Sequence, residues 1–232
     1  MTYTFKETEP TAEMILTVGF ITTKADVALA QLEGEDYRHI TIALIDGYLT
    51  LYYSMKRKLE TANGFSTDNE VKSLRITKRR LNNDKHNIAR VHFSTDAIYL
   101  SVPNYDLSME DEMTERTVVV NGGDVEELDK FGRPKQVSIG RSRDIKSGLA
   151  RSLPTSYEGC MSGAKIVLQP HATKVKPFRR SLELDLFKMF DDQNDQNNDN
   201  SNNNQEKNPI GDLTDATTEC GASLRIPGEK TF

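Results

Sequence analysis

The sequence predicts an α+β, mostly β fold, in which a single β-rich domain ends in an amphipathic helix and is followed by a disordered tail. Short segments rich in β-branched and aliphatic residues recur between turn residues over the first 170 positions. An apolar stripe at helical spacing follows them, and then a run with no apolar residue. We therefore expect a β-rich globular domain over residues 1–190 and an Asn/Asp-rich acidic tail over residues 191–232.

The expected strands alternate with turn signals along the whole domain. Asp46-Gly47 lies between two of them and predicts a tight type I′ hairpin, because both central positions of that turn need positive φ. The segment after this turn has two interpretations: a return strand over Tyr48–Tyr53, or a helix over residues 48–59 with one apolar face. In chain order the expected strands are Glu13–Thr23, Ile40–Ile45, Tyr48–Tyr53, Val71–Thr77, Arg90–Ser94, Ala97–Val102, Thr117–Val120, Gln136–Ile139 and Ala164–Leu168.

Three segments have helical character. A short helix is expected from Thr23 or Lys24 to Gly34, and one or two helical turns over Ser108–Glu115. Pro177–Phe190 is the strongest candidate, because proline suits the first helical position and its apolar residues recur at i, i+4 and i+8. Beyond it, Asp191–Asn208 cannot bury enough apolar area to offset the entropy of ordering, so it is expected to be disordered.

The charge is unevenly spread, although the chain as a whole carries −5. From Met189 to the C-terminus, nine acidic residues stand against three basic ones, so this segment carries −6. The first 188 residues keep 27 bases and 26 acids. The predicted domain is therefore close to neutral, and the acidity belongs to the tail.

Cysteine usage and hydropathy predict an intracellular protein. Cys160 and Cys220 do not form a disulfide framework, and we expect them to stay unpaired. The first residues lack the basic and apolar regions of a signal peptide, and no apolar run approaches the ~20 residues of a membrane span. The expected location is a reducing intracellular compartment, with no secretion, no transmembrane segment and only peripheral membrane contact.

No catalytic motif is present, so we expect a non-enzymatic protein without a cofactor. The four histidines, His39, His86, His92 and His171, show no metal-binding spacing. The chain has no Gly-x-Ser-x-Gly elbow and no phosphate-binding glycine loop.

Basic clusters carry the remaining functional signal. Lysines and arginines gather in three places, and in a near-neutral domain they are either ordinary surface residues or phosphate contacts. On the second interpretation the partner is a nucleic acid, bound without sequence preference, and the mobile acidic tail competes for the same surface. The residues expected to contact phosphate are Lys78, Arg79, Arg80, Arg141, Arg143, Arg179 and Arg180.

Short motifs in the first half of the chain are similar to those of plant-virus cell-to-cell movement proteins of the thirty-kilodalton superfamily. Leu44-Ile45-Asp46-Gly47-Tyr48 resembles a family motif with one residue missing, and Val71–Arg80 resembles the strand that leads into a Lys-Arg pair. Val102–Tyr105, followed by Asp111 and Met113, resembles a third. The hallmark acid expected near Thr77 is absent. The resemblance implies a β-rich protein that binds single-stranded nucleic acid cooperatively at plasmodesmata and carries viral genomes between cells.

Two other functions stay open. The order of elements up to Leu59 is also similar to the core of rhabdovirus matrix proteins, which implies an assembly protein that binds nucleocapsids and membranes and self-associates. The basic N-terminal arm and Pro-Pro-x-Tyr motif of that family are absent. The third possibility is a cellular adaptor with no nucleic-acid role.

Overall fold

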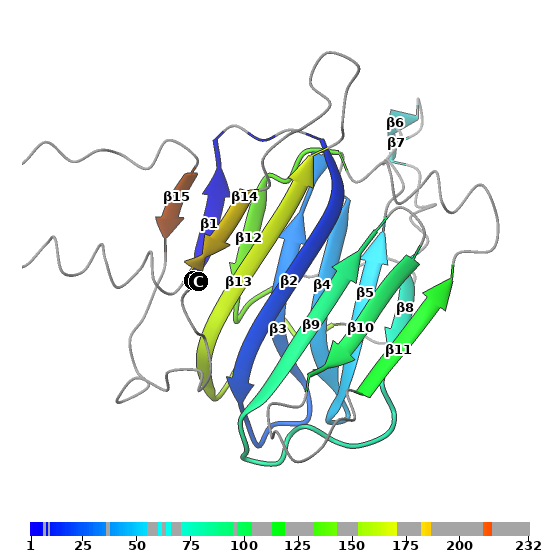
Figure 1. Cartoon of the computed structure of the whole chain (residues 1–232), viewed down its shortest axis with the longest axis vertical. Helices are drawn as coiled ribbons and strands as arrows, with labels where there is room; N and C mark the ends of the chain where they lie inside the picture. The colour runs from blue at the N-terminus through cyan, green and yellow to red at the C-terminus, as the bar shows by residue number, and fades with distance from the viewer. Residues whose placement is uncertain are drawn as a thin grey trace, which may run out of the picture.

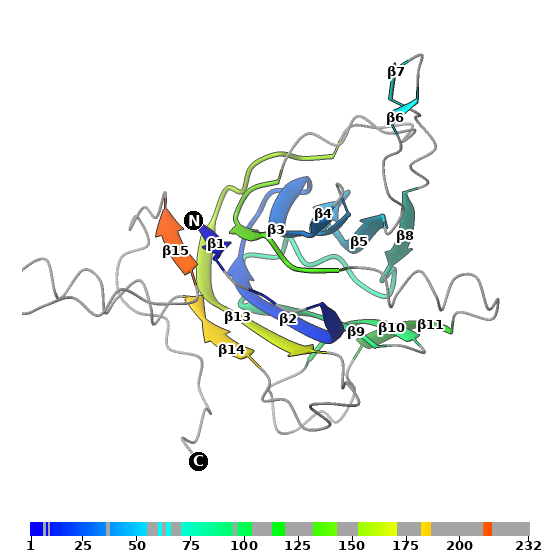
Figure 2. The same cartoon turned by 90° about the horizontal axis from the view of Figure 1, so that it is seen from above.

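The structure is a computed structural model. It describes residues 1–6, 8, 10–35, 38–54, 60–61, 64–65, 71–94, 97–103, 113–118, 132–142, 153–170, 182–186 and 211–214. Two antiparallel sheets pack face to face in this part of the chain, as Figures 1 and 2 show. The described residues contain no helical element, and therefore none that is long and apolar enough to cross a membrane.

The first sheet has seven strands in the order β15-β1-β12-β3-β4-β5-β8. Strands β3, β4 and β5 are consecutive in the chain and pair as a meander, whereas β1, β12 and β15 come from distant parts of the sequence. The bounds, in sheet order, are β15 Gly211–Thr214, β1 Thr2–Phe5, β12 Gln136–Ile139, β3 Val27–Glu33, β4 His39–Ile45, β5 Tyr48–Ser54 and β8 Lys72–Arg75.

The second sheet has six strands in the order β11-β10-β9-β2-β13-β14. Its centre is the long pair of β2 and β13, whose register shifts between Met161 and Gly163. The bounds, in sheet order, are β11 Met113–Val118, β10 Ala97–Val102, β9 Asn87–Phe93, β2 Thr11–Ile21, β13 Cys160–Pro170 and β14 Leu182–Asp185. A separate two-stranded hairpin joins β6 (Glu60–Thr61) to β7 (Gly64–Phe65).

The core lies between the facing sides of the two sheets. Alternate residues of each central strand enter it, so the aliphatic side chains of both layers exclude water along the length of the sandwich. Side chains that are less than 2% exposed include Leu16, Phe20, Leu29, Leu32, Ile42, Leu44, Leu49 and Leu51.

Most of the expected strands are confirmed. The β4–β5 connection has positive φ at Asp46 (52°) and Gly47 (81°), as a type I′ turn requires. Tyr48–Ser54 is β5, so the strand interpretation of this segment is correct, and positions 55–59 lie outside the described residues. The β9–β10 pair, β12 and β13 also fall where they were expected.

The helix expected from Lys24 to Gly34 is wrong, because Val27–Glu33 forms β3. This strand is buried on both faces, so it lacks the alternation that identifies a strand in sequence. In the segment expected to form helical turns before Glu115, Met113–Glu115 belongs to β11, and the earlier positions lie outside the described residues.

The C-terminal helix expected over Pro177–Phe190 is not confirmed. Leu182–Asp185 is β14, and the other residues of that range, except Leu186, are outside the described part of the chain. The same residues satisfy a period of two: Leu184 and Leu186 are buried, while Glu183 is exposed and Asp185 is half-buried. Pairing with β13, where Leu184 lies opposite Ile166, selects the strand over the helix.

Two features of the C-terminal region differ from expectation. Gly211–Thr214, within the segment expected to be disordered, forms β15 and pairs with β1. Cys160 is disulfide-bonded, so the expectation of unpaired cysteines is wrong. The chain has one other cysteine, Cys220, which is outside the described residues.

Candidate functional site

Several connections meet at the end of the sandwich that lies at the bottom of Figure 1, where β2 and β4 end and β5 and β9 begin. Backbone hydrogen bonds tie these connections together. Gly47 N donates to Ala25 O at 2.8 Å, Asp84 N to Thr22 O at 3.2 Å, and Ala28 N to Ser156 O at 2.9 Å. The connections at this end therefore hold one another in place through backbone hydrogen bonds and are not independent loops.

The β8–β9 connection, residues 76–86, supplies most of the positive charge here, and we call it the basic loop. Its first half is fixed at two buried points. Ile76 N donates to Leu49 O at 2.9 Å and Leu81 N donates to Gly47 O at 2.7 Å, and both side chains are at most 1% exposed. The residues between these anchors, Thr77–Arg80, are all exposed. Burial of the two aliphatic side chains thus forces Lys78, Arg79 and Arg80 outward.

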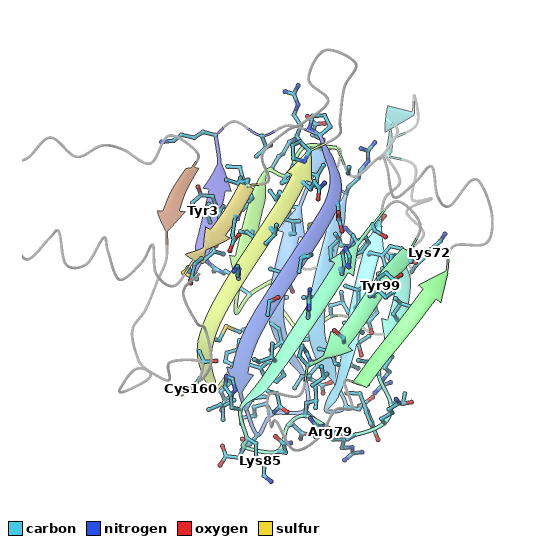
Figure 3. The ribbon with its side chains drawn as sticks, in the orientation of Figure 1. Tyr3, Lys72, Arg79, Lys85, Tyr99 and Cys160 are labelled. Atoms are coloured by element: carbon cyan, nitrogen blue, oxygen red, sulfur yellow. The ribbon has the colours of Figure 1, made fainter. Side chains whose placement is uncertain are left out.

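The second half of the basic loop is fixed by side-chain amides. Asn87, 5% exposed, donates through Nδ2 to Leu81 O at 3.2 Å and to Lys85 O at 2.7 Å. Asn82 donates to Thr23 O at 3.3 Å, which ties the basic loop to the β2–β3 connection. Such asparagine-to-backbone bonds hold a turn without regular secondary structure. In Figure 3, Arg79 and Lys85 project from this end of the molecule, whereas Lys72 lies well above them on the right-hand side.

Charge pairing divides the basic residues of this end into two groups. Lys24 is 2.9 Å from the Glu158 carboxylate and Arg75 is 3.3 Å from that of Asp46, so these two cations have acidic partners. Lys78, Arg79, Arg80 and Lys85 form no ion pair with any residue that the structure describes. The second group gives this end an excess of unneutralised positive charge, which attracts anions.

Arg80 and Arg75 share one aromatic ring. The guanidinium carbon of Arg75 is 4.8 Å from the centroid of Tyr48, and that of Arg80 is 5.5 Å from it, both within cation–π range. Arg75 also donates to Ile45 O at 2.7 Å and to the Asp46 carboxylate. Tyr48 begins β5, directly after the type I′ turn, so the turn places the ring beside the basic loop.

The structure brings four of the seven predicted contact residues toward the same end. Lys78, Arg79 and Arg80 are in the basic loop, and Arg141 is exposed and bridges to Ser156, the residue that accepts the hydrogen bond of Ala28 at the start of β3. Arg143, Arg179 and Arg180 lie outside the described residues. Residues that sequence reasoning missed are Tyr48 and Asn87, since neither is charged.

A serine of β13 meets the histidine that ends the basic loop. His86 Nε2 is 2.6 Å from Ser162 Oγ, and Gly19 leaves room for the pair, because a Cβ there would lie 2.3 Å from that oxygen. Desolvation by burial lowers the pKa of His86, which favours the neutral ring. Within the described part of the chain, no three His, Cys, Asp or Glu side chains are grouped to hold a metal ion. The pair completes no recognisable catalytic triad with the contacts described.

Comparison with known proteins gives a fold and no family. No protein-family model matches the sequence, and no curated protein matches it. Among solved structures, mouse laminin α1 domains LG4-5 align with a TM-score of 0.52 and 9% identity over 80% of this chain and 44% of that chain. The LG1-3 region of laminin α2 aligns at 0.49 and 15%, over 71% and 29%. A tailspike enzymatic domain of bacteriophage CBA120 aligns at 0.44 and 7%, over 73% and 24%.

These similarities reach as far as the β-sandwich architecture. At 9% identity the laminin α1 match shows a shared fold alone. We draw no conclusion from the other two alignments, whose TM-scores are below 0.5. This chain spans less than half the length of each of these structures. A function therefore has to be argued from the basic end of this sandwich itself.

Proposed function

We propose that this protein is a non-enzymatic binding module that holds an extended polyanion against its basic end. One observation carries the proposal: Lys78, Arg79, Arg80 and Lys85 have no acidic partner among the described residues, and the loop that presents them is fixed at Ile76, Leu81 and Asn87. A fixed loop loses little conformational entropy when it binds, so its charges are available without a large ordering cost.

Single-stranded nucleic acid is the ligand that the sequence predicts, and we keep it as the first candidate. Phosphates spaced along a flexible strand can meet lysines and arginines of the basic loop without base-specific contacts. A role in carrying viral genomes between cells, or in matrix assembly, extends this proposal and rests on the short sequence motifs alone.

An acidic polysaccharide is the second candidate, and the disulfide at Cys160 favours it. Disulfides persist in oxidising compartments, where sulfated or carboxylated polysaccharides are the abundant extended polyanions and nucleic acids are scarce. The same loop chemistry serves both ligands, because sulfate and phosphate oxygens accept the same charge-assisted hydrogen bonds.

The test is an anisotropy titration of the full chain with labelled poly(U) RNA and, separately, with a labelled heparin oligosaccharide, each across a range of salt. We expect binding that weakens as salt rises. For RNA, the variant in which Lys78, Arg79 and Arg80 are all changed to Gln should lower the slope of log K against log salt by about 2, since each lost contact removes about 0.7.

The control is Arg90→Gln, which removes one exposed charge from the outer face of β9, on the other sheet. It should leave the affinity nearly unchanged. Equal losses from the triple variant and the control, or no binding of either polyanion at low salt, would overturn the proposal. Preference for heparin over RNA at equal charge would assign the ligand to the second candidate.

A further inference from the structure

We propose that Tyr48 is a positioning residue for the polyanion: its ring holds the guanidinium of Arg80 at a fixed place on the basic end, and so makes Arg80 the oriented anion contact of the site. This inference rests on the proposed function and adds to it a residue that carries no charge.

The two arginines near this ring differ in how many contacts they make with the rest of the protein. Arg75 is engaged three ways, by the Ile45 carbonyl, the Asp46 carboxylate and the Tyr48 ring. Arg80 has the ring contact, and among the described residues its guanidinium donates no hydrogen bond. The N–H donors of Arg80 are therefore available to an incoming anion, whereas Arg75 is held as part of the frame.

The ring itself is held in place. Tyr48 is half-buried, it pairs with Ile45 across the type I′ turn, and its neighbour Leu49 is fully buried in the core. A ring on a rigid strand restrains a long side chain that would otherwise sample many rotamers, and ordering such a side chain on binding is costly.

The backbone also holds Arg80 close to Tyr48. Leu81 N donates to Gly47 O, so Arg80 is attached directly to an anchored residue that meets the turn before Tyr48. A Cβ placed on Gly47 would lie 3.4 Å from the Cβ of Arg80, which shows how closely the loop approaches the turn. Lys78 and Arg79 have no aromatic contact among the described residues and act as diffuse charges. Planar, bidentate recognition of phosphate or sulfate then belongs to Arg80.

The experiment is a double-mutant cycle on polyanion binding by the full chain, with poly(U) RNA and the heparin oligosaccharide as probes. Tyr48→Leu should weaken binding roughly two- to fivefold, the range of one partly exposed cation–π contact. Tyr48→Phe keeps the ring and should bind as the unmodified chain does. Arg80→Lys keeps the charge but loses the planar stack, so it should weaken binding to a similar extent as Tyr48→Leu.

The decisive outcome is coupling. If Tyr48 acts through Arg80, the double variant Tyr48→Leu/Arg80→Ala binds as weakly as Arg80→Ala alone. Additive losses, or full affinity in Tyr48→Leu, overturn the inference. Thermal unfolding of each variant separates positioning from folding. If Tyr48→Leu weakens binding by disturbing the fold, its melting temperature falls, and the loss of affinity does not depend on which residue is at position 80. The proposed function has its own test: it is rejected if the variant with Gln at positions 78, 79 and 80 keeps the affinity of the unmodified chain.

Discussion

The two sheets of the sandwich differ in what their outer faces meet. On the seven-stranded sheet, the outward row of Ser138, Gln31 and Thr41 is at most 6% exposed, and Gln31 Nε2 donates to Thr41 Oγ1 at 2.9 Å. On the six-stranded sheet, the outward row of Arg90, Thr17 and Lys165 lies half or fully open to solvent. A polar side chain in a strand therefore does not by itself mark a solvent-facing surface in this protein.

The segment before β13 supplies part of the cover on the buried face. Leu153, 4% exposed, packs with Ala43 and Ile45 on the outward side of β4, and Tyr52 of β5 joins this small cluster. The polar row beside it then has to satisfy its hydrogen bonds internally, as the Gln31–Thr41 bond does. On the six-stranded sheet, the outward polar side chains can form their hydrogen bonds with water.

The largest expected effect comes from placing a charge on each outer face. Gln31→Glu puts a carboxylate at a site that is 1% exposed and should lower the free energy of unfolding by about 3 kcal/mol or more, because burial penalises the ionised carboxylate. Thr17→Glu lies between Arg90 and Lys165 and should change stability by less than about 0.5 kcal/mol. Urea denaturation measures both, and equal losses would remove the distinction between the faces.

A smaller effect is expected at Gly19 of β2, where the Ser162–His86 pair covers the outer face of the six-stranded sheet. Gly19→Ala should cost about 1–3 kcal/mol, because the new methyl group meets Ser162 Oγ at 2.3 Å and must displace the Ser162–His86 pair. In a Ser162→Ala background the oxygen is gone, so the same change should cost clearly less. Identical costs in both backgrounds would show that the crowding comes from elsewhere.

The smallest effect concerns pH and the same pair. Burial lowers the pKa of His86 below 6.5, so folding favours the neutral ring. This contribution to stability is present above pH 6.5 and is lost as the pH falls through the lowered pKa of the folded state. Between pH 7.5 and 5, the melting temperature should fall slightly more for the unmodified chain than for His86→Gln. Parallel curves for the two proteins would contradict a role for His86.

The contrast between the faces also explains which strands could be predicted from the sequence. β2, β9 and β13 carry at least some exposed or half-exposed outward residues, so β-branched content and alternation identify them. β3 is buried on both faces, and its Val-Ala-Leu-Ala-Gln-Leu run is equally compatible with a helix. β1 and β15 are four-residue strands at or next to the sheet edge whose partners are remote in sequence, and local patterns do not contain that information.

The candidate site was predictable in its charges and not in its construction. Lys78, Arg79 and Arg80 stand out as a basic run, and the Asp46-Gly47 turn is plain in the sequence. The basic run and the turn lie close together because of two tertiary contacts. One is the β5–β8 register, in which Thr50 lies opposite Arg75, and the other is the hydrogen bond from Leu81 N to Gly47 O. Tyr48 acquires its place beside two guanidinium groups from these tertiary constraints.

The pairing of β15 with β1 changes what it means to shorten this chain. A protein cut at Asp191, where composition places the end of the domain, loses the strand that covers the outer edge of β1. The bared row of backbone donors and acceptors on Thr2–Phe5 is a template for any extended segment, including that of a neighbouring molecule. A truncation intended to remove the acidic tail would thereby move the open edge of the sheet from β15 to β1, and self-association of such a fragment would report the new edge rather than a misfolded core.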